Sequence, residues 1–140
     1  MSLQDRLAAV LGEVLVLTRE DDGAITAHHD GTIASLRVVD IADGLELVSL
    51  TQILAWDLPL DAKLRAAVAD HAHNTLLGTV SLAAKSGHKE VAAGAKRNSK
   101  KAADVLLRYN FPAAGLTDDA LRTLILMVLA TGADVRRALI

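Results

Sequence analysis

The chain has 140 residues and a formal net charge of −2 at pH 7, and 51% of its residues are hydrophobic. This length predicts a single domain over residues 1–140, and the composition is too apolar for a disordered chain. The sequence has no cysteine, which excludes disulfides, thiolate metal sites and thiol nucleophiles. The absence of cysteine favours the cytoplasm, and no apolar run approaches the roughly 20 residues of a membrane helix, so we expect a soluble, cytoplasmic protein with no membrane contact. Aromatic residues are too few for base stacking, so nucleic acid is not the expected partner.

An amphipathic helix is predicted at the start of the chain. Leu3, Leu7 and Val10 recur at helical spacing, and Ser2 precedes them as a suitable N-cap. Gly12 marks the expected end of the helix. The helix therefore presents one apolar side to the rest of the domain.

The next part of the chain is predicted to form an antiparallel meander. Asp-Gly pairs favour tight hairpin turns, and here they separate runs rich in Val, Ile, Thr and Leu at residues 22–23, 30–31 and 43–44. The runs TIASLRVVDI and LELVSLTQILAW alternate, so we expect one face of this hairpin to be buried and the other to be partly in contact with water. Pro59 is expected to end this part of the sheet.

A helix, two strands and a final helix are predicted in the second half of the chain. Asp61 is suited to cap a helix whose apolar side includes Leu64 and Val68 and which ends near Gly78. The run TVSLAAK predicts a strand, and ADVLLRYNFP predicts a further strand that Pro112 closes. The expected fold class is α+β, with an antiparallel β-sheet packed with helices in the order helix, β-meander, helix, two strands, helix.

The last helix is predicted to have apolar residues outside the stripe that faces the core. It begins after Thr117, with two aspartates in the first turn, where the helix dipole favours negative charge. Leu126, Met127 and Ala130 lie outside the stripe that faces the core. Because an exposed apolar patch promotes association, we predict that these three residues form a partner or dimer surface.

The chain's five histidines are the residues most suggestive of a chemical site. His71 and His73, in the stretch VADHAHNTLLG, are two apart on a predicted helix, so they point about 200° away from each other and cannot bind one metal ion together. His28 and His29 are adjacent on a strand and point to opposite faces, and His88 stands alone. We therefore predict no catalytic residue, metal or cofactor. The alternative is a small-molecule- or metal-dependent enzyme that uses His28, His71 or His88.

Residues 85–101 carry a local excess of positive charge. Six basic residues and one acid give the segment a net charge of +5, so the remainder of a chain of net −2 carries −7. The candidate residues for binding an anion are Lys96, Arg97, Lys100 and Lys101. A regulator linked to nucleic acid is thus a further alternative, whereas the simpler interpretation is a solvated loop, because no aromatic residue is interleaved with the charges.

Two runs of the sequence resemble the YbjN-domain family, which adopts the fold of the type III secretion chaperones. They are LELVSLTQILAWDLP, followed by a helix and a strand, and DVLLRYNFPAAGLTDDALRTLILMVLATGADV. The resemblance covers about residues 32–140. Asn74 fits one of two asparagines that the family often shows three apart, whereas His71 stands at the other position, and residues 86–101 are longer than the turn expected there.

The resemblance implies helices on an antiparallel sheet, commonly in a homodimer, and it brings no catalytic residues. Secretion chaperones of this fold wrap an extended partner segment over apolar patches and sheet edges. We therefore expect a non-enzymatic, homodimeric binding domain, chaperone-like or regulatory, that holds a protein or peptide partner.

Overall fold

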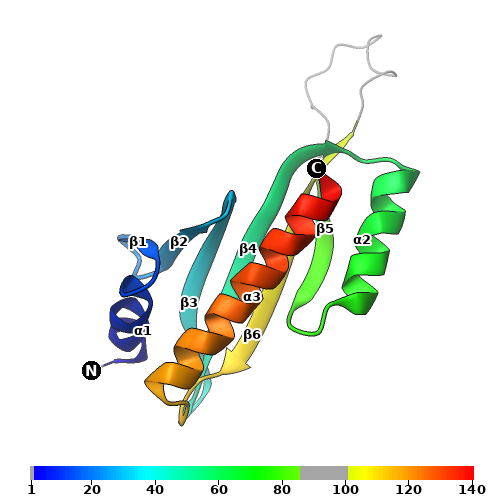
Figure 1. The fold of residues 1–140 in the computed structure, drawn as a ribbon. Coiled ribbons are helices and arrows are strands. Elements are labelled where there is room, and N and C mark those ends of the chain that lie inside the picture. Colours follow the sequence, from blue (N-terminus) through cyan, green and yellow to red (C-terminus); the bar gives the residue numbers. More distant parts are fainter. Residues whose placement is uncertain (1, 86–100) are drawn as a thin grey trace, which may run out of the picture.

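The computed structural model describes residues 2–85 and 101–140, which form three helices and a six-stranded antiparallel sheet (Figure 1). The helices are α1 (Leu3–Gly12), α2 (Ala62–Asn74) and α3 (Asp118–Leu139). The strands are β1 (Val16–Arg19), β2 (Ile25–His29), β3 (Thr32–Ala42), β4 (Leu45–Pro59), β5 (Thr79–Lys85) and β6 (Ala102–Pro112). The predicted α+β fold class is confirmed. None of these helices is both long and apolar enough to cross a membrane.

The helices begin at the caps that the sequence predicts. The side-chain oxygens of Ser2, Asp61 and Thr117 accept hydrogen bonds from backbone N–H groups in the first turns of α1, α2 and α3. Helix α2 ends earlier than the expected Gly78, at Asn74. Thr75 has already left the helical conformation, and its hydroxyl donates to the carbonyl oxygen of His71 at 2.5 Å.

The sheet has the strand order β1-β2-β3-β4-β6-β5. Its first four strands form the predicted meander, and the chain turns between them at the three Asp-Gly pairs. At the β2–β3 turn, Asp30 and Gly31 have φ angles of 46° and 80°, the left-handed pair that a two-residue hairpin turn requires. Strand β6 then pairs with both β4 and β5, which leaves β5 at the edge.

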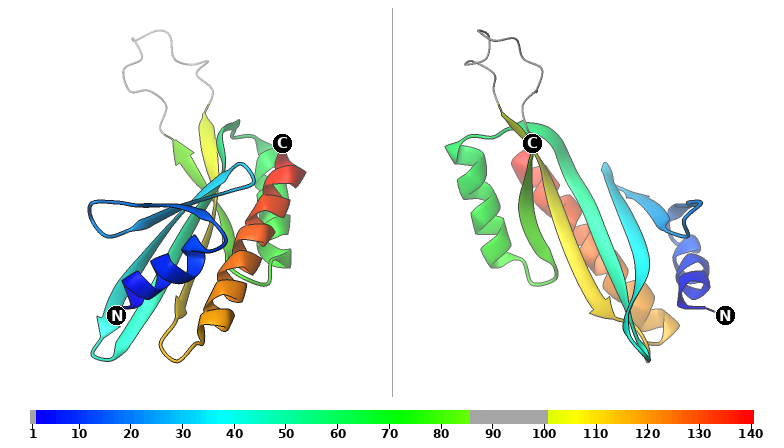
Figure 2. Two further views of the ribbon diagram at one scale, coloured as in Figure 1. Left: turned by 60° about the vertical axis from the view of Figure 1, so that its left-hand side comes forward. Right: turned by 180° about the vertical axis from the view of Figure 1, so that it is seen from behind.

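All three helices lie on one face of the sheet. Helix α3 crosses β3 and β4, α1 packs beside it, and α2 packs against β5 (Figures 1 and 2). The core lies between these layers. Its largest fully buried side chains include Leu7, Leu11, Leu36, Leu50, Leu107, Ile125 and Leu129.

Buried hydrogen bonds connect α3 to the sheet. The Gln52 side chain of β4 is fully buried, and its amide nitrogen donates to Thr32 Oγ1 at 2.9 Å and to the Leu129 carbonyl oxygen at 3.1 Å. Gly132 lies directly against this amide, because a Cβ atom at position 132 would be 2.0 Å from Gln52 Oε1. One turn later, Arg136 Nη1 donates to the Leu54 carbonyl oxygen at 2.7 Å. Close approach of helix and strand therefore requires glycine at position 132.

The opposite face of the sheet is packed against no other helix or strand of residues 2–85 and 101–140. In the view from behind in Figure 2, the sheet lies in front of α3. We call this side the open face. Its central residues alternate with the buried ones and are Ile33, Ser35, Arg37 and Val39 of β3, Leu47, Ser49, Thr51 and Ile53 of β4, and Leu106, Arg108 and Asn110 of β6.

Candidate functional site

The predicted surface on α3 lies on the outer side of that helix. Met127 is 51% exposed, Ala130 is exposed, and Leu126 is partly buried. The residues predicted to face the core are largely buried, among them Leu121, Ile125, Val128 and Leu129. Helix α3 thus exposes apolar surface outside the core.

The histidines do not converge. His71 is partly buried and His73 is exposed on α2, while His28 is exposed on β2, on the open face. His29 Nε2 lies 3.8 Å from Asp30 Oδ2 at the adjoining turn. Across residues 2–85 and 101–140, no three His, Cys, Asp or Glu side chains come together in a way that would hold a metal ion. His88 lies outside the described residues.

Most of the basic segment also lies outside the described residues, including Lys96, Arg97 and Lys100. Lys101 is exposed, and its carbonyl oxygen accepts a hydrogen bond from the Leu60 N–H at 3.1 Å. Lys85 is paired, since its Nζ lies 2.5 Å from Asp57 Oδ1 and 3.1 Å from Asp104 Oδ1. The anion-binding loop stays a prediction, and the charge of Lys85 is balanced locally.

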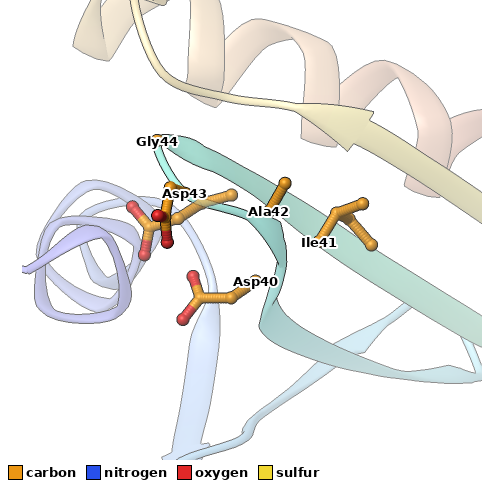
Figure 3. Close-up of a pocket in the computed structure, with 6 residues that line it drawn as sticks. Asp40, Ile41, Ala42, Asp43 and Gly44 are labelled. Atoms are coloured by element: carbon orange, nitrogen blue, oxygen red, sulfur yellow. The ribbon is translucent and has the colours of Figure 1, made fainter.

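Several hollows mark the surface of the domain, and two of them lie at opposite ends of β4. The first, of about 430 Å³, lies at the β3–β4 turn, where Figure 3 shows the carboxylates of Asp40 and Asp43 pointing away from Ile41. The second, which we call the helix groove, measures about 270 Å³ and lies between α2 and the end of α3. It is lined by Leu58, Pro59, Asp61, Lys63, Leu64, Ala67, Ala138 and Leu139. Neither hollow is lined by a histidine, and the helix groove is largely apolar.

The open face is the larger feature, and it is organised in rows that run across the strands. Residues paired in adjacent antiparallel strands point to the same side, so the strand register sets each row. The apolar row consists of Val16, His28, Ile33, Ile53, Leu106 and Ser81. The hydroxyl row beside it consists of Thr18, Thr26, Ser35, Thr51, Arg108 and Thr79. A second apolar row contains Val39, Leu47 and Pro112.

One end of the open face carries an aromatic residue beside an ion-paired cluster. Trp56 lies within the second break of the β4–β6 register, between Ala55 and Leu58, and is 36% exposed. Asp57 has a φ angle of 56°, and its N–H donates to Asp104 Oδ1 at 3.0 Å. The carboxylates of Asp57 and, to a lesser extent, Asp104 raise the pKa of the Lys85 ammonium by accepting its hydrogen bonds. Tryptophan is enriched at protein-binding surfaces.

The sequence contains the signal for the open face, namely the alternation in β3 and β4. It does not show which of the two alternating sets the helices cover. Comparison with protein-family models and with curated proteins finds no significant match for this chain. Its function is therefore inferred from these surfaces.

Proposed function

We propose that this chain is a non-enzymatic, homodimeric binding domain, chaperone-like or regulatory, that holds an apolar segment of a protein partner. One observation supports the proposal above the others. Apolar side chains are exposed on two opposite sides of the domain, although the core between the helices and the sheet is already fully buried. Contiguous exposed apolar patches are typical of surfaces that bind a partner.

The helix side offers the place for a partner segment. The helix groove has an apolar floor made by side chains such as Leu58, Leu64 and Leu139, with Asp61 and Lys63 among its polar residues. A groove of this kind suits a segment with one or two apolar side chains and polar neighbours. Met127 adds exposed apolar surface on α3, so a longer segment would find a second contact on that helix.

The resemblance to the YbjN-domain family agrees with this proposal. It implies an α+β domain that holds an extended segment and commonly forms a homodimer. The domain described above has the order of elements on which the resemblance depends, with β4 followed by a helix, two strands and the apolar helix α3.

Protein capture from a lysate of the source organism tests the proposal. The wild-type bait should retain one protein reproducibly, as identified by mass spectrometry. Ala67→Glu places a charge in the helix groove and should abolish the capture. Ala66→Glu is the matched control, because Ala66 is its exposed neighbour on α2 outside the groove. Equal capture by the two variants, or none by the wild type, would contradict the proposal.

A further inference from the structure

We infer that the open face is the homodimer interface, with two copies packed face to face about a two-fold axis that runs along β4. The inference rests on the proposed function, of which it specifies the dimer. The resulting assembly has four layers, with the helices of each copy outside and the two sheets inside, and it leaves the helix groove of each copy free for a partner.

The area of the open face fits a stable dimer. With the axis over β4, the five strands from β2 to β5 in the sheet order face the second copy and span about 19 Å, and β3 and β6, with 11 residues each, extend for about 35 Å along the sheet. This area is of the same order as the ~800 Å² per partner that a standard protein interface buries. Sheets that pack face to face in this way, about 10 Å apart, form the ordinary core of a β-sandwich.

The rows of the open face are complementary to themselves. An axis parallel to the strands keeps each row at the same height, so that each row meets the same row of the second copy. With the axis over β4, Ile53 meets Ile53 of the second copy, and β3 lies over β6 of the second copy. Ile33 then faces Leu106, and Val39 faces Pro112. Apolar side chains are thus buried against apolar side chains, which is the main source of binding free energy.

The charged residues of the open face restrict the position of the axis. With the axis over β4, Arg108 faces Ser35 of the second copy and Arg37 faces Asn110, each a polar, uncharged residue. The Arg37 side chains of the two copies are then two strands apart, about 10 Å. The Arg108 side chains of the two copies are also two strands apart, and an axis between β4 and β6 would instead place them about 5 Å apart, where like charges repel. Arg37 is ion-paired with Asp22 at 2.7 Å, so its charge distinguishes the axis positions less.

A matched pair of charge substitutions tests the interface by light scattering at a series of protein concentrations. Ile53→Asp places two carboxylates opposite each other at the axis, and we expect the dissociation constant of the dimer to rise by on the order of 100-fold. Met127→Asp introduces the same charge on the outer side of α3 and should leave the dimer unchanged. Circular dichroism of both variants checks that they are folded.

Cross-linking provides a second test that does not depend on Ile53→Asp being folded. The chain has no cysteine, so a single introduced cysteine is the only thiol in each copy. Thr51→Cys lies at the axis, and a short bis-maleimide spans two sheets that are about 10 Å apart. Thr18→Cys, in the same row but on the edge strand β1, is the control, because its two copies lie on opposite edges of the assembly. We expect covalent dimers from Thr51→Cys alone.

The possible failures are distinguishable. A wild-type protein that is monomeric at all concentrations overturns both the inference and the homodimer of the proposed function. A dimer that survives Ile53→Asp and is lost in Met127→Asp overturns the inference alone and moves the interface to α3. Cross-linking of Thr18→Cys as efficient as that of Thr51→Cys overturns the position of the axis.

Discussion

The two faces of the sheet are built from the same strands, yet one is a core and the other is a surface. On the covered face of β4, Val48, Leu50 and Gln52 are fully buried. On the open face of the same strand, Leu47 and Ile53 are comparably apolar and stay partly exposed. The difference is made by the apolar stripes of three helices, all of which pack on one side. The alternation of side chains along the strands therefore gives the sheet two faces that carry apolar residues. The helices of the same chain cover only one of these faces.

The largest expected effect is the difference in stability between leucine-to-alanine substitutions on the two faces of the sheet. Leu50→Ala removes a fully buried side chain beneath the helices and should lower the free energy of unfolding by about 2–5 kcal/mol. Leu47→Ala, three residues away on the open face, should cost less than about 1 kcal/mol in the monomer. Urea unfolding at low protein concentration measures both values. Equal losses would mean that the open face is covered within a single chain.

The contact between α3 and β4 gives the next largest effect. Gly132→Ala forces a methyl group against the buried Gln52 amide, and we expect a loss of about 2–3 kcal/mol. In a Gln52→Ala background the obstruction is absent, and alanine favours the helix by up to about 1 kcal/mol over glycine. A double-mutant cycle of thermal unfolding measures this coupling. A Gly132→Ala cost that is the same in both backgrounds would contradict the assigned contact.

A smaller difference in stability is expected between glycine-to-alanine substitutions in two hairpin turns, one of which lies against α3. Gly31 and Gly44 have φ angles of 80° and 77°, so alanine should cost about 1 kcal/mol at either position. At Gly31 the added Cβ would also lie 2.9 Å from Arg136 Nε, whereas at Gly44 it would have no atom within 4 Å among the described residues other than its chain neighbours. Gly31→Ala should therefore be the more destabilising variant in urea unfolding. The reverse order would show that Arg136 moves aside without loss.

The smallest effect concerns an exposed ion pair beside the open face. The Ala24 N–H and, after it, Arg37 lower the pKa of the Asp22 carboxyl by hydrogen bonding to its charged form. Because the folded pKa is the lower one, this contribution is complete above about pH 4 and is lost as the pH falls through the folded pKa. Asp22→Asn should therefore lose less stability than the wild type between pH 7 and pH 3.

Much of the fold is predictable from local signals in the sequence. The caps Ser2, Asp61 and Thr117, the Asp-Gly turns, and the ends of β4 and β6 at Pro59 and Pro112 all depend on backbone chemistry within a few residues. The end of α2 at Asn74 comes before the predicted stop at Gly78. Its φ angle of 88° belongs instead to the turn that leads into β5.

The candidate surfaces are predictable only in part, because they depend on contacts between distant residues. The outer side of α3 is set by the periodicity of its own sequence, so the exposure of Met127 is predictable from the sequence. The rows of the open face require the strand register, and residues such as Ile33, Ile53 and Leu106 come from three strands. The pairing of Lys85 with Asp57 likewise joins residues that are far apart in the chain. No local pattern contains that information.

The place of β4 between β3 and β6 has a consequence for the synthesis of the protein. Strand β3 is made just before β4 and is available at once as its neighbour. The second neighbour begins only at Ala102, long after β4 ends at Pro59. At the usual rate of translation this interval lasts on the order of seconds. During that time the longest strand of the sheet has one row of unpaired backbone groups, so the unfinished chain is most prone to edge-to-edge aggregation before its last strand emerges.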